Sequence, residues 1–186
     1  MATATQVLRH EHDAILKMVS VTEEVARRLD HGEEVRPETL GNLLEFFRLF
    51  TDQCHHGKEE ELLFPLLERK GIPRHGRPIG VMLAEHEQGR SLIQEMRHAA
   101  EAHHAGAEGA ASRWAQAARS YAALLRAHIE KENNALFVMA ERVLNAGEQA
   151  GLAEDFEKLE VEKMGVGTHE RLHAMMDKLL AEIMPK

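Results

Sequence analysis

Two stretches of the sequence, 73 residues apart, share one pattern of polar and apolar residues. HHGKEEELLFP begins at residue 55 and HIEKENNALF begins at residue 128, and the two align without a gap as H-x-x-K-E-x-x-x-L-F. Both stretches are helix-forming, and residues four apart lie on one face of a helix with Cβ atoms about 5–6 Å apart. His55 with Glu59, and His128 with Glu132, can therefore each present a nitrogen and an oxygen to the same interior point.

A second element precedes each of these pairs. Glu11-His12 lies 43 residues before His55, counted from the histidine, and Glu85-His86 lies 42 residues before His128. Two nearly equal spacings indicate an internal repeat. The sequence thus predicts two related helical hairpins, each giving one histidine from its first helix and a His-x-x-x-Glu pair from its second.

Helical periodicity runs through almost the whole chain, and strand patterns are absent. We expect helices over 5–29, over 37–70 with a bend at Pro65, from Pro78 to the HHAGAEGAAS stretch, and over 112–145. On the last of these, the predicted inward stripe holds Tyr121, Leu124, Leu125, His128, Ala135 and Met139. The predicted fold class is all-α, an antiparallel up-down four-helix bundle over 5–145 with one or two extra C-terminal helices over 150–184, in a single domain of residues 1–186.

Charge and apolar patterning restrict the classes of partner. The net charge of −8 opposes binding to nucleic acid or to anionic membrane surfaces. No apolar run approaches the roughly 20 residues needed to span a bilayer, and the start MATATQVLRHEHD lacks the apolar core of a signal peptide, so we expect a cytoplasmic protein. The one cysteine, Cys54, excludes an internal disulfide framework and a cysteine-rich zinc site, and we expect it to be buried.

The histidines need a physical explanation, because 13 of them occur in a chain with eight aromatic Phe, Trp and Tyr residues. Each uncompensated buried polar group costs roughly 1–3 kcal/mol, so six of them would undermine a fold worth about 5–15 kcal/mol. Metal ions reverse this cost. Two divalent cations, each taking two histidines and sharing both glutamates, would satisfy the six side chains, and nitrogen and oxygen ligands without thiolate suit iron, manganese or zinc.

This ordered set resembles one known family. His12, His55-x-x-x-Glu59, His86 and His128-x-x-x-Glu132, with Leu-Phe behind each glutamate, look like the hemerythrin-like (HHE cation-binding) family of four-helix-bundle non-haem di-iron proteins. The resemblance covers residues 5–145 and implies two iron ions inside the bundle, joined by an oxo or hydroxo bridge, with one histidine from each helix and the two glutamates bridging.

The resemblance also narrows the expected function. Respiratory hemerythrins have a further histidine where this chain has Met82, and an aspartate in place of Glu132. The four-histidine, two-glutamate pattern is more similar to bacterial di-iron proteins of iron–sulfur cluster repair and nitrosative stress. Fewer histidine ligands leave more coordination positions for dioxygen, nitric oxide, peroxide or water. The leading expectation is a di-iron protein that binds, senses or reacts with such molecules.

Two other function classes remain open. The same centre could serve an enzyme of iron–sulfur cluster repair, iron handling or peroxide dismutation. The chain could instead be a metal-free helical interaction protein whose histidines are structural. The sequence leaves the choice of small molecule, the redox partner and the oligomeric state open.

Several residues near the candidate ligands have more than one interpretation. His56 and Glu60 have the same i, i+4 spacing as His55 and Glu59, so the register on that helix has an alternative. Glu85, and Glu11 in the other half, could support a ligand or be exposed charge. Tyr121 lies two turns before His128 and is either an ordinary core residue or a hydrogen-bonding or redox partner. The lysines of the repeat, Lys58 and Lys131, are expected on a solvated face.

The C-terminal segment contains a literal match to the zinc-peptidase pattern H-E-x-x-H, as HERLH over 169–173. Its context is poor, since 13 residues follow it and a sheet edge for a peptide is not predicted. The surrounding sequence resembles the C-terminal extension of some HHE proteins, in which His169 would pack near the bundle end or act as an additional ligand. Two Glu-x-x-His pairs, at 95–98 and 101–104, are interpreted as surface.

Overall fold

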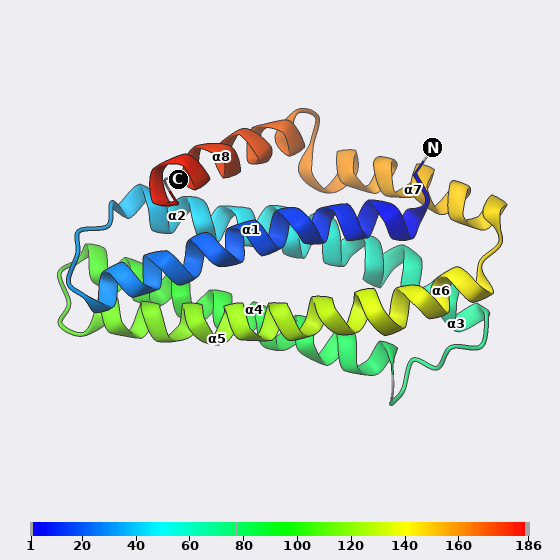
Figure 1. The fold of residues 1–186 in the computed structure, drawn as a ribbon, viewed down its shortest axis with the longest axis horizontal. Coiled ribbons are helices and arrows are strands. Elements are labelled where there is room, and N and C mark those ends of the chain that lie inside the picture. Colours follow the sequence, from blue (N-terminus) through cyan, green and yellow to red (C-terminus); the bar gives the residue numbers. More distant parts are fainter. Residues whose placement is uncertain (1, 77, 185–186) are drawn as a thin grey trace.

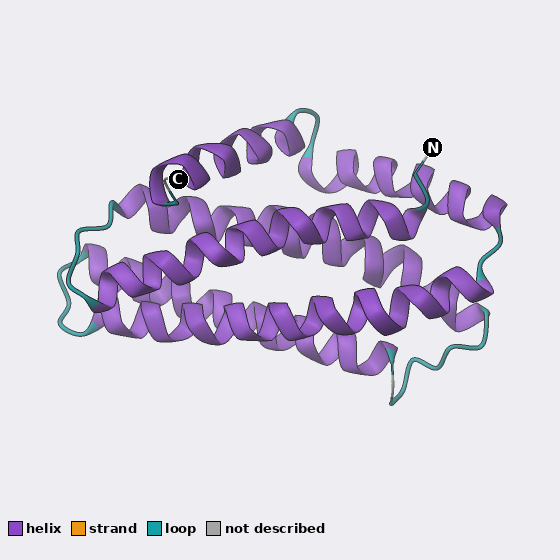
Figure 2. Ribbon diagram, in the orientation of Figure 1, coloured by secondary structure: helices purple, strands orange, loops and turns teal. Residues whose placement is uncertain are grey.

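The structure, a computed structural model, describes residues 2–76 and 78–184, and in this range the chain is helical with no strand (Figure 2). The α-helices are α1 (Ala4–Asp30), α2 (Pro37–Phe46), α3 (Phe64–Arg69), α4 (Ile79–His104), α5 (Ala110–Lys131), α6 (Phe137–Val143), α7 (Ala146–Met164) and α8 (Thr168–Ile183). Three π-helical segments join them, η1 (Phe47–His56), η2 (Glu59–Leu63) and η3 (Glu132–Leu136). The predicted all-α class is therefore confirmed.

Side chains cap the N-termini of two of the helices. Thr3 accepts from the backbone N–H of Gln6 at 3.3 Å while its own N–H donates to the Gln6 side chain at 2.9 Å, which forms a capping box at the start of α1. Asn145 and Glu148 form the same box at the start of α7. The second box separates α6 from α7 and so begins the C-terminal extension.

Long helical stretches lie side by side along the longest axis of the molecule (Figure 1). The helix predicted over 37–70 corresponds to the run from α2 through η1 and η2 to α3. The helix predicted over 112–145 corresponds to the run from α5 through η3 to α6. Helix α5 packs along both α1 and α4, while α2 and η1 pack against α4. This arrangement is consistent with the predicted four-helix bundle. The extension forms two helices, α7 and α8, which contact α1 on the outside.

The π-helical segments were not predicted, and they shift which residues face inward. In η3 the buried residues are Glu132 and Leu136, followed by Phe137 and Ala140. Ala135, predicted on the inward stripe, is exposed, because a π turn holds more residues than the 3.6 of an α turn. Segments of this kind are frequent at functional sites.

The buried apolar side chains form two clusters rather than one. One cluster includes Ile15 of α1, Phe50 of η1 and Leu125 of α5. The other includes Leu8 of α1 and Leu63 of η2. On each helical stretch the candidate ligands lie between residues of the two clusters, so the histidines and glutamates form a polar layer across an otherwise apolar interior.

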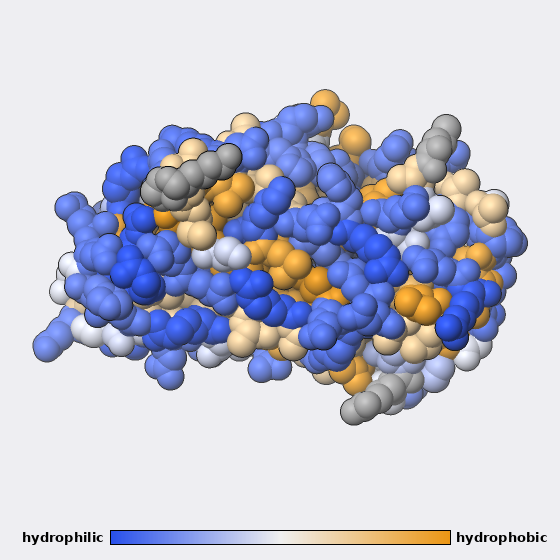
Figure 3. All heavy atoms as spheres, in the orientation of Figure 1, coloured by the Kyte–Doolittle hydropathy of each residue, from blue (hydrophilic) through white to orange (hydrophobic). Residues whose placement is uncertain are grey.

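The face of the molecule shown in Figure 3 is mainly hydrophilic. On the face shown in Figure 3, hydrophobic side chains gather along the seam between α1 and α5. Within residues 2–76 and 78–184, none of the helices is both long and apolar enough to cross a membrane.

Candidate metal centre

Six buried side chains converge in the polar layer. They are His12 from α1, His55 from η1, Glu59 from η2, His86 from α4, His128 from α5 and Glu132 from η3. Their ligand atoms form two overlapping groups, one with His12 and His55 and the other with His86 and His128, and both groups include Glu59 and Glu132. Within each group the ligand atoms lie within 4.8 Å of one another. We call these groups position 1 and position 2.

The two carboxylates each reach both positions. Glu132 places one oxygen 3.1 Å from His12 Nε2 and the other 3.3 Å from His128 Nε2. Glu59 places one oxygen 3.7 Å from His55 Nε2 and the other 3.4 Å from His86 Nε2. Each glutamate thus turns one oxygen to each position, which is the geometry of a bridging carboxylate.

The contacts inside each position fit a cation. His12 Nε2 lies 3.0 Å from His55 Nε2, and His86 Nε2 lies 3.1 Å from His128 Nε2. Two imidazole nitrogens at this distance repel unless a proton or a metal ion lies between them. Nitrogens bound at about 2.1 Å to one ion and at a right angle to each other would be about 3.0 Å apart.

The carboxylate oxygens give the same indication. All four side-chain oxygens of Glu59 and Glu132 are buried and have no hydrogen-bond partner within the described residues. Unsatisfied buried carboxylates are costly, and coordination to a metal is one of the few ways of compensating them. The residues present therefore fit a pair of cations.

A carboxylate or amide oxygen orients the outer nitrogen of each ring. His55 Nδ1 donates to Glu11 at 2.8 Å, and His128 Nδ1 donates to Glu85 at 2.9 Å. These oxygens accept only, so they fix the tautomer that leaves Nε2 free for a metal. The sequence left the roles of Glu11 and Glu85 open, and the structure shows that both hold a histidine.

The other two histidines have partners that the sequence did not indicate. His12 Nδ1 donates to the amide oxygen of Asn133 at 3.0 Å, and His86 Nδ1 donates to Glu60 at 2.7 Å. Glu60 and Asn133 each directly follow a bridging glutamate, so they occupy equivalent positions in the repeat. That equivalence could have suggested them.

The two halves differ in the surroundings of the repeat lysines. Lys131 pairs with Glu85 and its side chain is 43% exposed. Lys58 pairs with Glu11, but only 1% of its side chain is exposed, because Glu160 of α7 covers it and accepts from Nζ at 2.9 Å. The expectation that Lys58 is solvated was wrong. Cys54, buried as expected, lies 3.8 Å from Glu160.

Burial and charge perturb the ionisation of the centre in the absence of metal. Burial, followed by the charge of Glu132, raises the pKa of Glu59 well above its ordinary value. Burial lowers the pKa of His55 to about 4. At His128 burial acts in the same direction, but the charge of Glu132, together with the hydrogen-bonded carboxylate of Glu85, outweighs it and raises the pKa to about 9.

The two possible registers, His55 with Glu59 and His56 with Glu60, differ in where the structure places their side chains. Glu60 lies at the edge of the layer, where it binds Arg90 at 2.7 Å and His86 Nδ1, and it is in neither position. His56, however, is buried and can bring a ring nitrogen within 4.8 Å of ligand atoms of His86 and His128. The structure therefore brings His55 and Glu59 together with the other four residues, and adds His56 beside position 2.

The remaining candidates lie outside both positions. Tyr121 is buried and packs edge-on against Phe47 at 4.9 Å between ring centroids. His169 lies on α8, where its Nδ1 is 3.8 Å from Glu160 and its ring stacks on Phe50. Among the described residues, none of the groups able to hold a metal includes His169 or His173. The Glu-x-x-His pairs at 95–98 and 101–104 are exposed, as predicted.

Comparison with known families agrees with this geometry. The sequence model of the hemerythrin HHE cation-binding domain matches residues 3–140. The chain belongs to this family. The match includes all six converging residues and ends before α7 and α8, so the hemerythrin-like region is the layer-bearing part of the molecule.

The chain also resembles uncharacterised proteins of Mycobacterium bovis and Mycobacterium tuberculosis. Each is 27% identical to it over 163 residues, which is 88% of this chain and 63% of the relative. The chain thus spans about 63% of the length of these relatives.

Proposed function

We propose that this hemerythrin-like chain, as a single domain with an antiparallel up-down four-helix bundle, binds two iron ions and handles dioxygen, nitric oxide or peroxide there. The observation that carries the proposal is the pair of bridging glutamates, whose four oxygens are buried, unpaired and shared between two histidine pairs. Nitrogen and oxygen ligands without thiolate suit iron, with manganese or zinc as alternatives.

The chain's own residues determine what such a centre can do. Glu11, Glu85, Glu60 and Asn133 hold the four imidazoles with Nε2 directed inward. The two apolar clusters on either side of the layer exclude water from it. Each position has four protein ligands, so coordination positions remain for a small molecule, to which bound iron supplies Lewis acidity and electrons.

We propose further that His56 is a fifth histidine ligand, at position 2. Its ring nitrogen is within reach of the ligand atoms of His86 and His128, whereas its equivalent in the other half is Ile129, which cannot bind a metal. Position 2 would then have five protein ligands and position 1 four. The small molecule would accordingly bind at position 1, which has more open coordination sites.

Metal analysis tests the proposal. Elemental analysis of the purified chain should find about two metal ions per chain, with iron confirmed by anomalous scattering at its absorption edge. Glu59→Gln should lower this content by at least half, because it weakens a ligand of both positions. Glu61→Gln is the matched control, since Glu61 is exposed two residues further along the same helical stretch.

Two results would contradict the assignment. A metal-free chain that is as stable as the loaded one would favour a helical interaction protein. A loss of metal with Glu60→Gln but not with Glu59→Gln would favour the other register. Turnover of peroxide by the loaded protein would point instead to the enzyme alternative at the same centre.

A further inference from the structure

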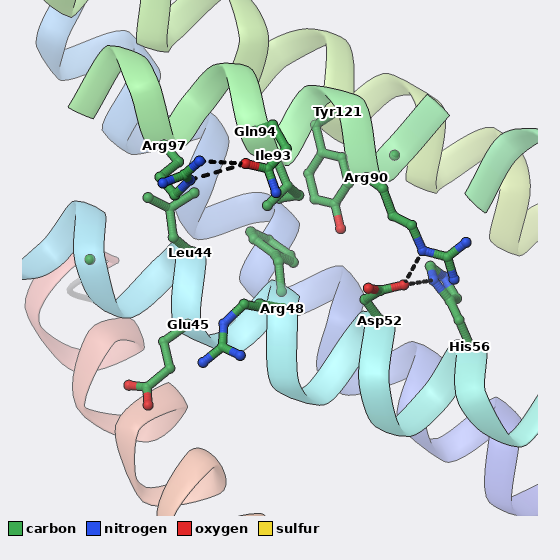
Figure 4. A pocket seen from close by; sticks show the side chains of 13 residues that line it. Leu44, Glu45, Arg48, Asp52, His56, Arg90, Ile93, Gln94, Arg97 and Tyr121 are labelled. Carbon is green, nitrogen blue, oxygen red and sulfur yellow. Dashed lines mark hydrogen bonds and ion pairs between the residues drawn. The ribbon is translucent and has the colours of Figure 1, made fainter. Parts of the chain in front are cut away.

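A pocket of about 460 Å³ opens beside the metal centre (Figure 4). It lies between the α2–η1 run and α4, with Tyr121 of α5 among its lining residues. Ligand pockets for small organic molecules commonly have volumes of about 300–1,000 Å³. The space is therefore larger than a diatomic gas or a peroxide requires.

The pocket reaches the metal centre through His56. This side chain lines the pocket, and its ring stacks on that of His86 with 3.8 Å between centroids and an interplanar angle of 14°. Gly89, one helical turn after His86, lines the same space. A molecule in the pocket would therefore contact the outer side of position 2.

The charges around the pocket favour an anion, although the whole chain carries a net charge of −8. Three guanidinium groups line it, those of Arg48, Arg90 and Arg97, against two carboxylates, those of Glu45 and Asp52. Arg90 binds Asp52 at 2.7 Å and also pairs with Glu60 and Glu87, while Arg97 pairs with Glu101 at 3.2 Å. Glu45 is bound by Arg171 of α8, outside the pocket, at 3.0 Å. Arg48 has no ion-pair partner among the described residues, so its charge is unbalanced.

Two further polar groups in the pocket lack partners. The Nδ1 atom of His56, a side chain with 4% of its surface exposed, has no hydrogen-bond partner in the described chain, and its closest acid is Asp52 at 3.5 Å. The hydroxyl of Tyr121 points into the gap between α4 and η1 (Figure 4). It makes none of the hydrogen bonds found among residues 2–76 and 78–184. The His56 nitrogen is a buried polar atom without a partner, and the Tyr121 hydroxyl makes no hydrogen bond within the described chain, so both are available to a ligand.

We propose that this pocket binds a small organic anion, a carboxylate carried on an apolar body. Arg48 supplies the unbalanced positive charge, and Tyr121 supplies a hydroxyl donor. Leu44, Phe47 and Ile93 give the apolar wall against which the body of the ligand lies. The site goes beyond the proposed function, because Arg48, Tyr121 and the apolar wall belong to neither metal position.

Three probes of one shape and different charge test this site on the full-length chain. Benzoate, benzamide and benzylamine are titrated separately, and the Kd is measured by ligand-observed NMR. Benzoate should bind at least about tenfold more tightly than benzamide, because a charged acceptor makes the stronger hydrogen bonds. Benzylamine should bind most weakly.

Variants locate the binding. Arg48→Gln should raise the Kd of benzoate about tenfold and leave that of benzamide nearly unchanged. Arg142→Gln is the matched control, since Arg142 is an exposed arginine on α6 outside this pocket, and it should change neither Kd. Gly89→Leu should abolish binding of all probes, because even a Cβ at residue 89 would lie 3.4 Å from the Tyr121 ring.

Equal binding of the three probes, preference for benzylamine, or no binding at all would overturn the proposal. Benzoate binding that is unchanged in Arg48→Gln would also overturn it, and this exposed variant is decisive if Gly89→Leu does not fold. Metal content is measured on the same samples. Benzoate binding in samples without metal would show that the pocket proposal holds even if the di-iron assignment fails.

Discussion

Glu59 and Glu132 bring two carboxyl groups together in a layer that water does not reach. Without a metal, burial and the nearby charge of Glu132 raise the pKa of Glu59. A carboxyl group whose pKa is raised on folding contributes stability that is lost as the pH rises through that higher value. The residue that we propose as a bridging ligand therefore weakens the fold when no metal is bound.

Replacing this residue should have opposite effects in the two states. In protein stripped of metal, Glu59→Gln should increase the free energy of unfolding by about 1–3 kcal/mol, because a neutral amide ends the repulsion. The gain should grow from pH 6 to pH 9, since glutamine does not titrate. In loaded protein the same change should lower the melting temperature. Urea denaturation of both forms measures this, and a loss of stability in both would refute the repulsion argument.

Spacing alone predicted the six candidate ligands that the structure brings together, because two histidines and one glutamate occur in the same order in each half of the chain. The residues that hold them were harder to predict. Lys58 has the same sequence context as Lys131, and it is buried only because Glu160, about a hundred residues later, covers it. A contact between segments so distant in sequence leaves no periodic signal.

Among the elements, α7 makes the two equivalent hairpins unequal. It lies over η1 and η2 and closes the side of the layer on which Glu11 binds His55. On the other side, Glu85 and Lys131 remain accessible to solvent. An extension outside the family match thus changes the electrostatics of one half of the centre.

The repeat offers a matched pair of substitutions to measure this difference. Lys58→Met should lower the free energy of unfolding by about 3 kcal/mol, because it leaves Glu11 and Glu160 without their buried cation. Lys131→Met should cost less than about 1 kcal/mol, because exposed ion pairs contribute little. Chemical denaturation at equal metal content measures both, and equal losses would show that α7 does not isolate Lys58 from solvent.

The helices themselves were predictable from periodicity and from Pro37, Pro78 and the glycine-rich links. The predicted helical ranges agree closely with those observed. The π-helical segments were not predictable in this way. Where a π-helical segment forms depends on how its side chains pack in the interior, and a periodic sequence pattern does not show this. In η3, for example, Ala135 is exposed although α-helical periodicity predicted it to face inward. An assumption of 3.6 residues per turn therefore fails at His55, Glu59 and Glu132, although it holds along α1.

At the scale of the whole molecule, the polar layer divides the interior into two apolar clusters. We therefore expect metal binding to contribute to folding, since both clusters meet at the proposed ligands. Sequence patterns predicted that this layer exists. They did not predict the pocket beside it, because its lining comes from α2, η1, α4 and α5 at once.

Metal uptake should depend on pH over a defined range. His128 has a pKa of about 9 in the metal-free protein, so at pH 7 it carries a proton that the metal must displace. The apparent affinity should increase from pH 7 to pH 9, because the fraction of His128 that carries a proton falls over this range. Competition with a chelator of known affinity measures this, after correction for the chelator's own protonation. An affinity that is constant over this range would contradict the shifted ionisation of His128.

His55 and His56 are consecutive, and both are buried, in the π-helical segment η1. A widened turn rotates each residue by a smaller angle than an α turn, so two neighbouring imidazoles can both be directed to the interior and divided between the two ion positions. Shortening this turn by deleting one residue would swing one ring out toward solvent. The proposed difference in ligand number between position 1 and position 2 therefore depends on the backbone of η1.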